Sequence, residues 1–375
     1  MIPLARPDVS EKEVEAVVKV LRTPYLSLGP KLAEFERRLA EYAGVKYAVA
    51  VNSGTSALHL IIKSLGIGEG DEVITTPFSF IASANCILYE RATPVFVDID
   101  PYTWNINTEL IEEKITEKTK AILAVDIFGH PADWDRLQQI AEKYGLKLVE
   151  DAAEALGAEY KGKKAGSFGD AAAFAFYPNK QITTGEGGAV LTDDEAIATL
   201  CRSLRNQGRR EGGGWLEHER LGYNYRISDI NCALGIAQLE RLEELLKKRE
   251  KVAKLYNERL KGMDEITLPH LSREVKKSWF VYVVKLCDKF TKTDRDEILQ
   301  NLRERGIECG NYFGPIHLQP FYRNIFSYKE GDFPVTEKVA KRTIALPFHG
   351  GLTEEEIEYV CEALKKAIAS LGKTR

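Results

Sequence analysis

Apolar residues recur at helical spacing over the first 44 residues of the chain. Ser10 and Glu13 have the spacing of a capping box, and the apolar positions behind them repeat every three or four residues, so a helix is predicted to begin near Glu11. A second helix is predicted over 31–44, because its apolar side chains form one stripe and Gly44 is a good left-handed terminator.

From Tyr47 onward the pattern changes to short apolar runs separated by segments of helical length and periodicity. The runs are YAVAV, EVITT, PVFVDI, AILAVDIF and LKLVED, followed by AAAFAFY and GAVLTDD. Strand and helix alternate about every 25 residues, which is typical of a mostly parallel sheet covered by helices on both faces. The pattern therefore predicts an α/β domain of roughly 230 residues.

The segment from Ser228 to Gly262 has helical composition for over 30 residues, with Ser228 as N-cap and Gly262 as stop. A helix of this length usually joins two domains. Beyond it, SWFVYVVKL, the helical segment DRDEILQNLRERG and an amphipathic segment from Thr353 indicate a smaller α+β unit. The sequence thus predicts a large α/β domain, 1–245, and a small C-terminal α+β domain, 246–375.

Length and composition narrow the class of protein. A chain of 375 residues favours two domains, and a net charge of -4 argues against binding to nucleic acid or a membrane, so small molecules are the expected partners. No apolar run approaches the roughly 20 residues that span a bilayer, and the N-terminus lacks the pattern of a signal peptide, so a cytoplasmic location is expected. The six cysteines form no close pair and predict buried thiols, with neither a disulfide framework nor a metal site.

Two features of the α/β domain could meet an anionic or cationic ligand. In VNSGTSALHL a predicted strand ends at Val51 and a helix opens near Thr55. Its free N–H groups, its hydroxyl groups and the helix dipole would suit a phosphate, although an ordinary N-cap explains the same residues. Asp151 follows the predicted core strand LKLVE, at the edge where open α/β sheets bind ligands, and could instead cap the next segment.

Lys180 is a third candidate. It stands between AFAFYP and TTGEGG with no carboxylate within five residues on either side. Desolvation would lower its pKa and suit it to Schiff-base chemistry, whereas an exposed lysine at a strand end is the structural alternative. No nicotinamide, P-loop or metalloprotease motif competes; His59 is expected to pack inside a helix, and His317 is the better candidate to face a ligand. Phosphate turn, carboxylate and lysine, in this order, are expected of a pyridoxal-phosphate enzyme.

Five motifs, in order and over nearly the whole chain, resemble those of the DegT/DnrJ/EryC1/StrS aminotransferases, which make amino sugars on nucleotide carriers. They are NSGTSALHL, EDAAEALGAEYKGKKAGSFGD, FYPNKQITTGEGG, LGYNYRISDINCALGIAQL and LPFHGGLTEEEI. The resemblance implies the fold of type I pyridoxal-phosphate-dependent aminotransferases, a homodimer with its active site at the subunit interface, and pyridoxal 5'-phosphate as cofactor.

The resemblance also implies roles for individual residues. Lys180 matches the lysine that binds the cofactor covalently, and Asp151 matches the carboxylate that pairs with the cofactor's ring nitrogen. Both are therefore the expected catalytic residues. Gly54, Thr55 and Ser56 match the cradle of the cofactor's phosphate.

Three further positions match contacts to the cofactor. Phe80 matches an aromatic residue that stacks on the ring, Glu154 a residue near the ring hydroxyl, and Asn224 a residue that reaches the phosphate from the other subunit. Two positions depart from the pattern. Ala175 stands where many relatives have a phosphate-binding serine, so a water, Ser56 or another donor is expected to replace that hydroxyl, and Gly314 replaces a common proline and should loosen a loop near the substrate entrance.

The implied reaction moves an amino group from glutamate or glutamine to a nucleotide-linked keto-deoxysugar, in the synthesis of cell-surface polysaccharides or secondary metabolites. A dehydrating branch of the family has histidine in place of the lysine, so Lys180 favours the aminotransferases.

The glycine-rich basic segment 205–226 is expected to be a mobile loop, and its arginines could clamp a pyrophosphate or simply face solvent: Arg205, Arg209, Arg210 and Arg220. The alternatives are another type I pyridoxal-phosphate enzyme, such as a lyase or an amino-acid transaminase, and a non-catalytic cofactor-binding regulator. The sequence leaves open the sugar, the nucleotide and the choice of C3 or C4.

Overall fold

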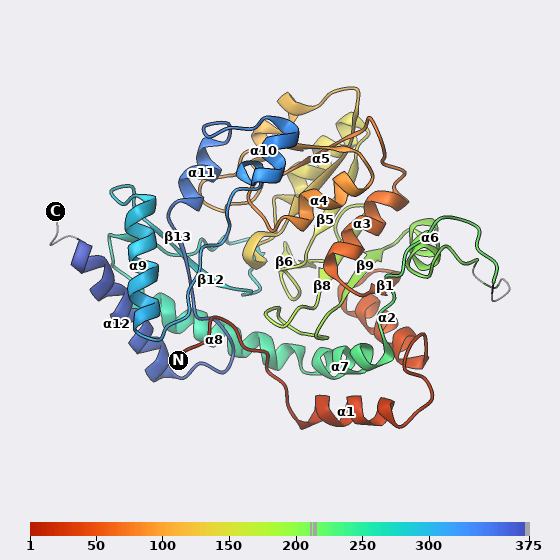
Figure 1. Ribbon diagram of the computed structural model, residues 1–375, viewed down its shortest axis with the longest axis horizontal. Coiled ribbons are helices and arrows are strands. Elements are labelled where there is room, and N and C mark those ends of the chain that lie inside the picture. The colour runs from red at the N-terminus through yellow and green to blue at the C-terminus, as the bar shows by residue number, and fades with distance from the viewer. Residues whose placement is uncertain (211, 213–215, 372–375) are drawn as a thin grey trace.

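A seven-stranded sheet forms the centre of the molecule (Figure 1). The computed structural model describes residues 1–210, 212 and 216–371. The strand order is β1-β9-β8-β5-β4-β2-β3, and β9 runs antiparallel to both of its neighbours while the other pairs are parallel. The strands are β1 (Tyr47–Val51), β2 (Glu72–Thr75), β3 (Thr93–Phe96), β4 (Thr119–Val125), β5 (Lys147–Asp151), β8 (Ala171–Ala175) and β9 (Gly188–Thr192).

Both faces of this sheet are buried, which explains why its strands are continuous apolar runs. Along β8, Ala171 and Ala173 belong to the core on one face, while Ala172 and Phe174 belong to the core on the other. The first face packs against α3 (Gly54–Ser64), α4 (Ala82–Tyr89) and α6 (Glu195–Arg205). The second packs against α2 (Pro30–Ala43), α5 (Trp134–Tyr144) and α7 (Asp229–Glu240).

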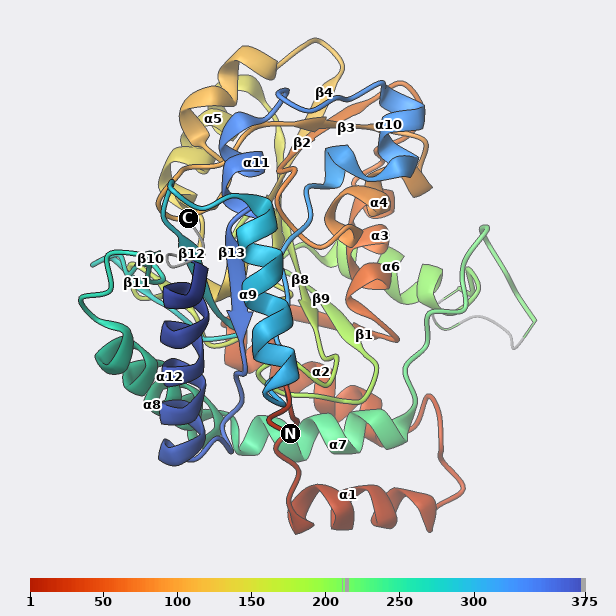
Figure 2. The same ribbon diagram turned by 60° about the vertical axis from the view of Figure 1, so that its left-hand side comes forward.

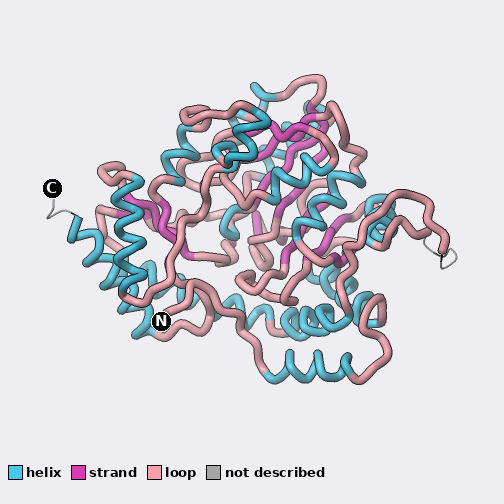
Figure 3. Tube along the Cα trace, in the orientation of Figure 1, coloured by secondary structure: helices cyan, strands magenta, loops and turns pink. Residues whose placement is uncertain are grey.

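A second, smaller sheet lies in the C-terminal part of the chain, where Figure 3 shows a separate group of strands. It contains β10 (Ile266–Thr267), β12 (Tyr282–Leu286) and β13 (Thr343–Leu346). Its core also takes in side chains from α8 (Leu242–Leu260), α9 (Lys292–Glu304) and α12 (Glu354–Leu371), which stand together in Figure 2. Ile2 packs in this core too. The division of the chain at residue 245 stays a prediction.

The remaining elements are short and join the larger ones. A three-stranded ribbon is formed by β6 (Glu159–Tyr160), β7 (Lys163–Lys164) and β11 (Val275–Lys276). Two helices, α10 (Pro320–Phe326) and α11 (Pro334–Ala340), lie between α9 and β13. Short 3-10 turns occur at Thr108–Leu110, Glu112–Lys114, Ile127–Gly129 and Ile316–Leu318. No helix within the described ranges is long and apolar enough to cross a membrane.

The predicted helix starts and stops are confirmed where a local motif defined them. Helix α1 (Glu11–Leu21) begins after Ser10, and the capping box with Glu13 is complete. Helix α2 ends at Gly44, whose φ of 77° lies in the left-handed region that favours glycine. Ser228 caps α7 by accepting a hydrogen bond from the N–H of Asn231. Residues 211 and 213–215 of the predicted mobile loop lie outside the described residues.

The single long helix predicted from Ser228 to Gly262 is wrong in one respect, because the chain breaks it into α7 and α8 at Arg241. The Arg241 guanidinium is turned into the protein, where it donates to Glu13 and Asp8 at 2.8 Å each. Gln238, one turn earlier, donates to the same Glu13 carboxylate at 2.9 Å. These contacts fasten α1 under α7, as Figure 2 shows, and they come from residues over 220 positions away in the sequence.

We expect Glu13→Gln to destabilise the protein by about 2–3 kcal/mol at pH 7. Glu13 is fully buried. Burial alone would raise its pKa, but hydrogen bonds from Ser10, Arg241 and Gln238 lower the pKa of Glu13 from 4.5 to about 2. Since the folded value lies below the unfolded one, Glu13 stabilises the fold above pH 4.5, and this contribution is lost as the pH falls toward 2.

Urea unfolding at several pH values between 7 and 3 measures this effect. The free energy of unfolding of the variant should fall less steeply with acid than that of the wild type. The exposed Glu15, on the same helix, provides the control Glu15→Gln, which should leave the curve unchanged. Equal stability of Glu13→Gln and wild type at pH 7 would contradict the assigned role.

Candidate active site

Three of the predicted site segments meet at one edge of the central sheet. Strands β1, β5 and β8 point the same way, because β1 and β8 are each antiparallel to β9 and β8 is parallel to β5. Their carboxyl ends therefore share an edge. The turn into α3 follows β1, Asp151 ends β5, and Lys180 lies in the loop after β8. Sheet topology thus brings together residues up to about 130 positions apart, at the edge where ligands usually bind.

Lys180 is largely buried, with 13% of its side chain exposed. Its Nζ lies 3.7 Å from Oε1 of Glu154 and 4.0 Å from the centre of the Phe280 ring. Burial lowers the pKa of Lys180, and the charges of Glu154 and Asp151 oppose that shift. The exposed-lysine alternative is therefore wrong, and Lys180 has the environment that favours a reactive amine.

Asp151 is buried and held by two hydrogen bonds. The hydroxyl of Ser83 donates to Oδ2 at 2.7 Å, and the backbone N–H of Ala153 donates to Oδ1 at 3.1 Å. Burial raises the pKa of Asp151, while the bond from Ser83 and the nearby charge of Lys180 lower it. A carboxylate fixed in this way is oriented to pair with a cationic group at the sheet edge.

Glu154 is also buried, and its two oxygens have different partners. Oε2 accepts a hydrogen bond from the N–H of Phe128 at 2.9 Å, and Oε1 faces Lys180. Burial raises the pKa of Glu154, whereas the charge of Lys180 lowers it. Two buried carboxyl groups, Asp151 and Glu154, therefore act on the largely buried ammonium of Lys180.

The start of α3 is a close-packed turn against β8 and β9. A Cβ at position 54 would lie 2.6 Å from the Cβ of Ala175, and one at Gly188 would lie 2.5 Å from the carbonyl oxygen of Ser53, so both approaches require glycine. The N–H groups of Gly54 and Thr55 donate no hydrogen bond within the described part of the chain. They remain available to an anion at the helix N-terminus.

The hydroxyl groups of this turn are not equivalent. Ser56 donates to Oδ1 of Asn52 at 2.7 Å and lies 2.8 Å from the hydroxyl of Ser53, so it is already engaged. The Thr55 hydroxyl makes no hydrogen bond to any described residue and is only half-buried. Thr55 is therefore a better substitute than Ser56 for the hydroxyl that Ala175 lacks. Free amides, a hydroxyl, a buried lysine and a buried carboxylate together fit a phosphate-bearing pyridine aldehyde such as pyridoxal phosphate.

Two predicted contacts lie on the surface of the single chain. Phe80, in the loop between β2 and α4, has 59% of its surface exposed. Asn224 is also exposed, and its carbonyl oxygen accepts a hydrogen bond of 3.4 Å from Asn52 at the start of the α3 turn. Their roles toward the cofactor and the other subunit stay predictions.

Among the basic residues of segment 205–226, Arg205 is not free to bind a ligand. It is buried, paired with Glu36, and donates to the carbonyl oxygen of Ala50 at 2.6 Å. Arg220 donates to the hydroxyl of Ser203 at 2.6 Å. Among the histidines, His317 is buried and lies 3.1 Å from Glu337.

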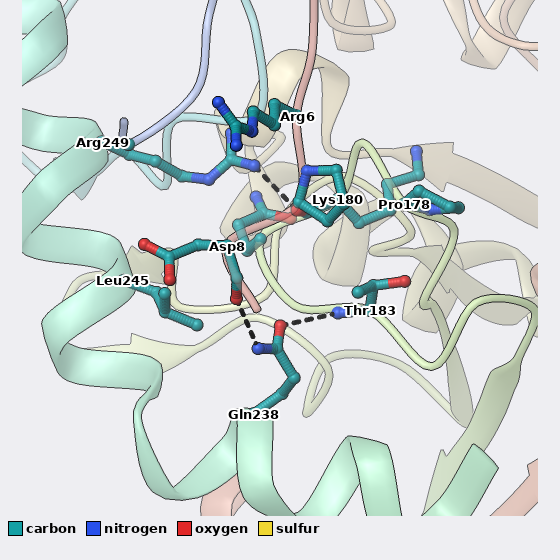
Figure 4. A pocket seen from close by; sticks show the side chains of 11 residues that line it. Arg6, Asp8, Pro178, Lys180, Thr183, Gln238, Leu245 and Arg249 are labelled. Carbon is teal, nitrogen blue, oxygen red and sulfur yellow. Dashed lines mark hydrogen bonds between the residues drawn. The ribbon is translucent and has the colours of Figure 1, made fainter. Parts of the chain in front are cut away.

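Four residues at the site carried no signal in the sequence. Ser83 orients Asp151, and Phe280 covers the ammonium of Lys180. Arg249 and Gln238, drawn in Figure 4, bind the backbone of the loop that carries the lysine. Their contacts depend on chain segments far from Lys180 in the sequence, so only a comparison of related sequences or the fold itself could have found them.

The chain matches the model of the DegT/DnrJ/EryC1/StrS aminotransferase family over residues 7–365. Among curated proteins, GDP-perosamine synthase from Caulobacter vibrioides is 40% identical over 369 residues, which cover 98% of each chain. The match spans both the α3 turn and the loop of Lys180.

Solved structures agree. PseC from Helicobacter pylori, an aminotransferase involved in the biosynthesis of pseudoaminic acid, has a TM-score of 0.94 at 33% identity and covers 98% of this chain and 99% of its own. Spr1654 from Streptococcus pneumoniae in its PLP form has a TM-score of 0.94 at 32% identity, with 99% of both chains covered, and its PMP form is similar as well. The predicted fold, that of pyridoxal-phosphate-dependent aminotransferases, is confirmed. The chain belongs to the DegT/DnrJ/EryC1/StrS family and is a sugar aminotransferase that depends on pyridoxal phosphate.

Proposed function

We propose that this enzyme transfers the amino group of glutamate or glutamine to a nucleotide-linked keto-deoxysugar, and that it acts as a homodimer. The observation that carries the proposal is the burial of Lys180 between Glu154 and Phe280, at the same sheet edge as Asp151. The kinship with a GDP-perosamine synthase favours a sugar attached to a nucleotide as the acceptor. A lyase would need the same lysine, but PseC is named an aminotransferase, which favours amino transfer.

When bound, pyridoxal phosphate supplies an electron sink for the carbanion that forms when an amino donor loses its α-proton. Lys180 is the residue that we assign to hold the cofactor and then to act as general base. Its lowered pKa leaves more of the amine unprotonated near neutral pH. A general base positioned in this way typically contributes about 10²- to 10⁴-fold in rate.

Asp151 is assigned to the protonated ring nitrogen of the cofactor. Its hydrogen bonds from Ser83 and Ala153 fix the carboxylate before any ligand arrives, so little reorganisation is needed on binding. We assign the phosphate to the free amides of Gly54 and Thr55 and to the Thr55 hydroxyl. Ser56 then supports the turn through Asn52.

The homodimer is proposed because Phe80 and Asn224, which are assigned to contact the cofactor, lie on the open surface of the single chain and would be buried by a second subunit. Both residues are exposed in the single chain. Large apolar side chains are exposed in the same parts of the molecule, between α1 and α2 and in the loops next to the site: Tyr25, Leu26, Leu28, Tyr177 and Leu221. A second copy of the chain would bury this surface and bring Asn224 to the neighbouring site.

The first half of the reaction is tested by absorbance of the purified enzyme with pyridoxal phosphate. The band of the bound cofactor, at about 420 nm, should move to about 330 nm when glutamate or glutamine is added. Lys180→Ala should give neither the band nor the shift, because the attaching amine is gone. Nucleotide-linked ketosugars are then added, and the acceptor is the one that returns the band.

A bound cofactor whose spectrum does not respond to either amino donor would contradict the aminotransferase step as assigned. Arg295→Met, a variant remote from the sheet edge, is the control for general damage to the protein and should respond as the wild type does.

Mixed dimers test whether Asn224 acts on the neighbouring site. Lys180→Ala and Asn224→Asp should each be nearly inactive, the second because a carboxylate repels the phosphate. A heterodimer of the two has both native residues at one of its two sites, so the isolated heterodimer should show about half of the wild-type activity, and the unseparated co-expression mixture about a quarter. Two different affinity tags isolate the heterodimer.

If Asn224 served the site of its own subunit, neither site of the heterodimer would be complete. Activity would then remain as low as in the two parent variants, and this result would refute the shared site.

A further inference from the structure

Arg249 is a buried cation directly behind the lysine loop. It belongs to α8 and is 5% exposed. Figure 4 shows its guanidinium directed at the backbone of Lys180. The catalytic roles assigned above make no use of this residue.

The hydrogen bonds of Arg249 go to carbonyl oxygens of two segments. One nitrogen donates to Lys180 at 2.8 Å and to Asn179 at 3.4 Å. The other donates to Phe280 at 3.1 Å and to Trp279 at 3.4 Å. The first segment carries the lysine, and the second carries the ring that lies 4.0 Å from its Nζ. The planar guanidinium therefore joins the backbone of Lys180 to the segment whose Phe280 ring covers the ammonium of that lysine.

Arg249 differs from the other buried arginines in its charge balance. Arg205 pairs with Glu36, Arg241 with Asp8 and Glu13, and Arg295 with Asp296. In the described part of the chain, no carboxylate lies within ion-pair distance of Arg249. The carboxylate whose charge acts on Arg249, Asp8, is bound by Arg241 and Lys248 at 2.8 Å each. The positive charge of Arg249 therefore acts on the groups around it, which include Lys180.

We propose that Arg249 is a positioning residue for amino transfer, which fixes the Lys180 backbone against the Phe280 segment and places an unpaired positive charge behind the lysine. The inference rests on the role of Lys180 in the proposed function. The fork restricts where Nζ can lie, so the amine can leave the cofactor and return to the same point. The charge disfavours an added proton on the nitrogen of Lys180.

The charged groups that act on Lys180 come from two segments of the chain. Glu154 and Asp151, from the end of β5 and the turn after it, favour the protonated form, and Arg249, from α8, opposes it. Phe280 contributes a ring and no charge. Removal of the Arg249 charge leaves burial alone to oppose the two carboxylates, so the titration midpoint of the Lys180 nitrogen should rise.

Two substitutions in the full-length enzyme with bound pyridoxal phosphate separate the fork from the charge. In Arg249→Met both are lost, and we expect the midpoint of the absorbance titration with pH to rise by about one unit. The single-turnover rate with glutamate should fall about tenfold or more. In Arg249→Lys the charge is kept, so the midpoint should stay near the wild type while the rate still falls, because an ammonium cannot reproduce the planar fork.

Arg295 provides the matched control. It is 2% exposed and donates to the carbonyl oxygens of Ala340 and Thr343 at 3.1 and 3.3 Å, and neither acceptor belongs to the Lys180 loop or the Phe280 segment. Arg295→Met should lower the melting temperature to a similar extent and leave the absorbance midpoint unchanged. If Arg249→Met and Arg249→Lys both keep the wild-type midpoint and single-turnover rate, and lose only stability, Arg249 is purely structural and the proposal is wrong.

A separate measurement guards against confusion with the proposed function. Borohydride reduction of the wild-type holoenzyme, followed by peptide mapping, should find the cofactor on Lys180. Attachment to a different lysine would refute the role of Lys180, and with it the inference, before any variant of Arg249 is made. Attachment to Lys180 together with unaltered Arg249 variants would refute the inference alone. If Arg249→Met does not fold, the single-turnover rate of Arg249→Lys still tests the inference, because an unchanged rate would refute the positioning role.

Discussion

The arrangement of the site depends on the burial of two carboxylates and one ammonium at a single sheet edge. Each charge loses its hydration there, and burial pushes the pKa of Asp151 and Glu154 upward and that of Lys180 downward. Their mutual attraction opposes all three shifts. Because such a cluster is costly to bury, it has to be held by fixed hydrogen bonds. Ser83 and the N–H of Phe128 provide these bonds for the two carboxylates.

The lysine is supported in a different way, which leaves its Nζ available for the role proposed for it. The structure holds the Lys180 loop by its backbone instead. Arg249 binds the carbonyl oxygen of Lys180, and Gln238 accepts a hydrogen bond of 3.2 Å from the N–H of Thr183 (Figure 4). Gln238 in turn donates to Glu13 and to the carbonyl oxygen of Asp8. The N-terminal segment and α1 therefore support the lysine loop through α7, and the break between α7 and α8 presents Gln238 and Arg249 to that loop from two directions.

Local patterns predicted what local physics determines. The sequence predicted the capping box of α1, the end of α2 at Gly44 and the alternation of strands and helices. The sequence also predicted that Asp151 lies at the end of a strand, because an apolar run precedes it. The break at Arg241 could not be predicted, because the residues around it have good helical propensity. Its cause is a pair of acidic groups from the N-terminal segment, Glu13 and Asp8, which bind the Arg241 guanidinium. Strand β13 was missed for a similar reason, since its four residues form a strand only beside β12.

The buried arginines explain why the same limit applies to the site. Arg205, Arg241 and Arg249 look alike in sequence, and Arg205 was the one considered as a ligand for phosphate. Their partners distinguish them: carboxylates for the first two, and carbonyl oxygens for Arg249. A carboxylate beside Arg249 would have lowered the cost of burying it, but it would also have been a third acid near Lys180 and would have favoured the protonated amine. Backbone carbonyls satisfy the guanidinium without adding a negative charge. The lack of an ion-pair partner in the described chain is thus consistent with the reactive role proposed for the neighbouring lysine.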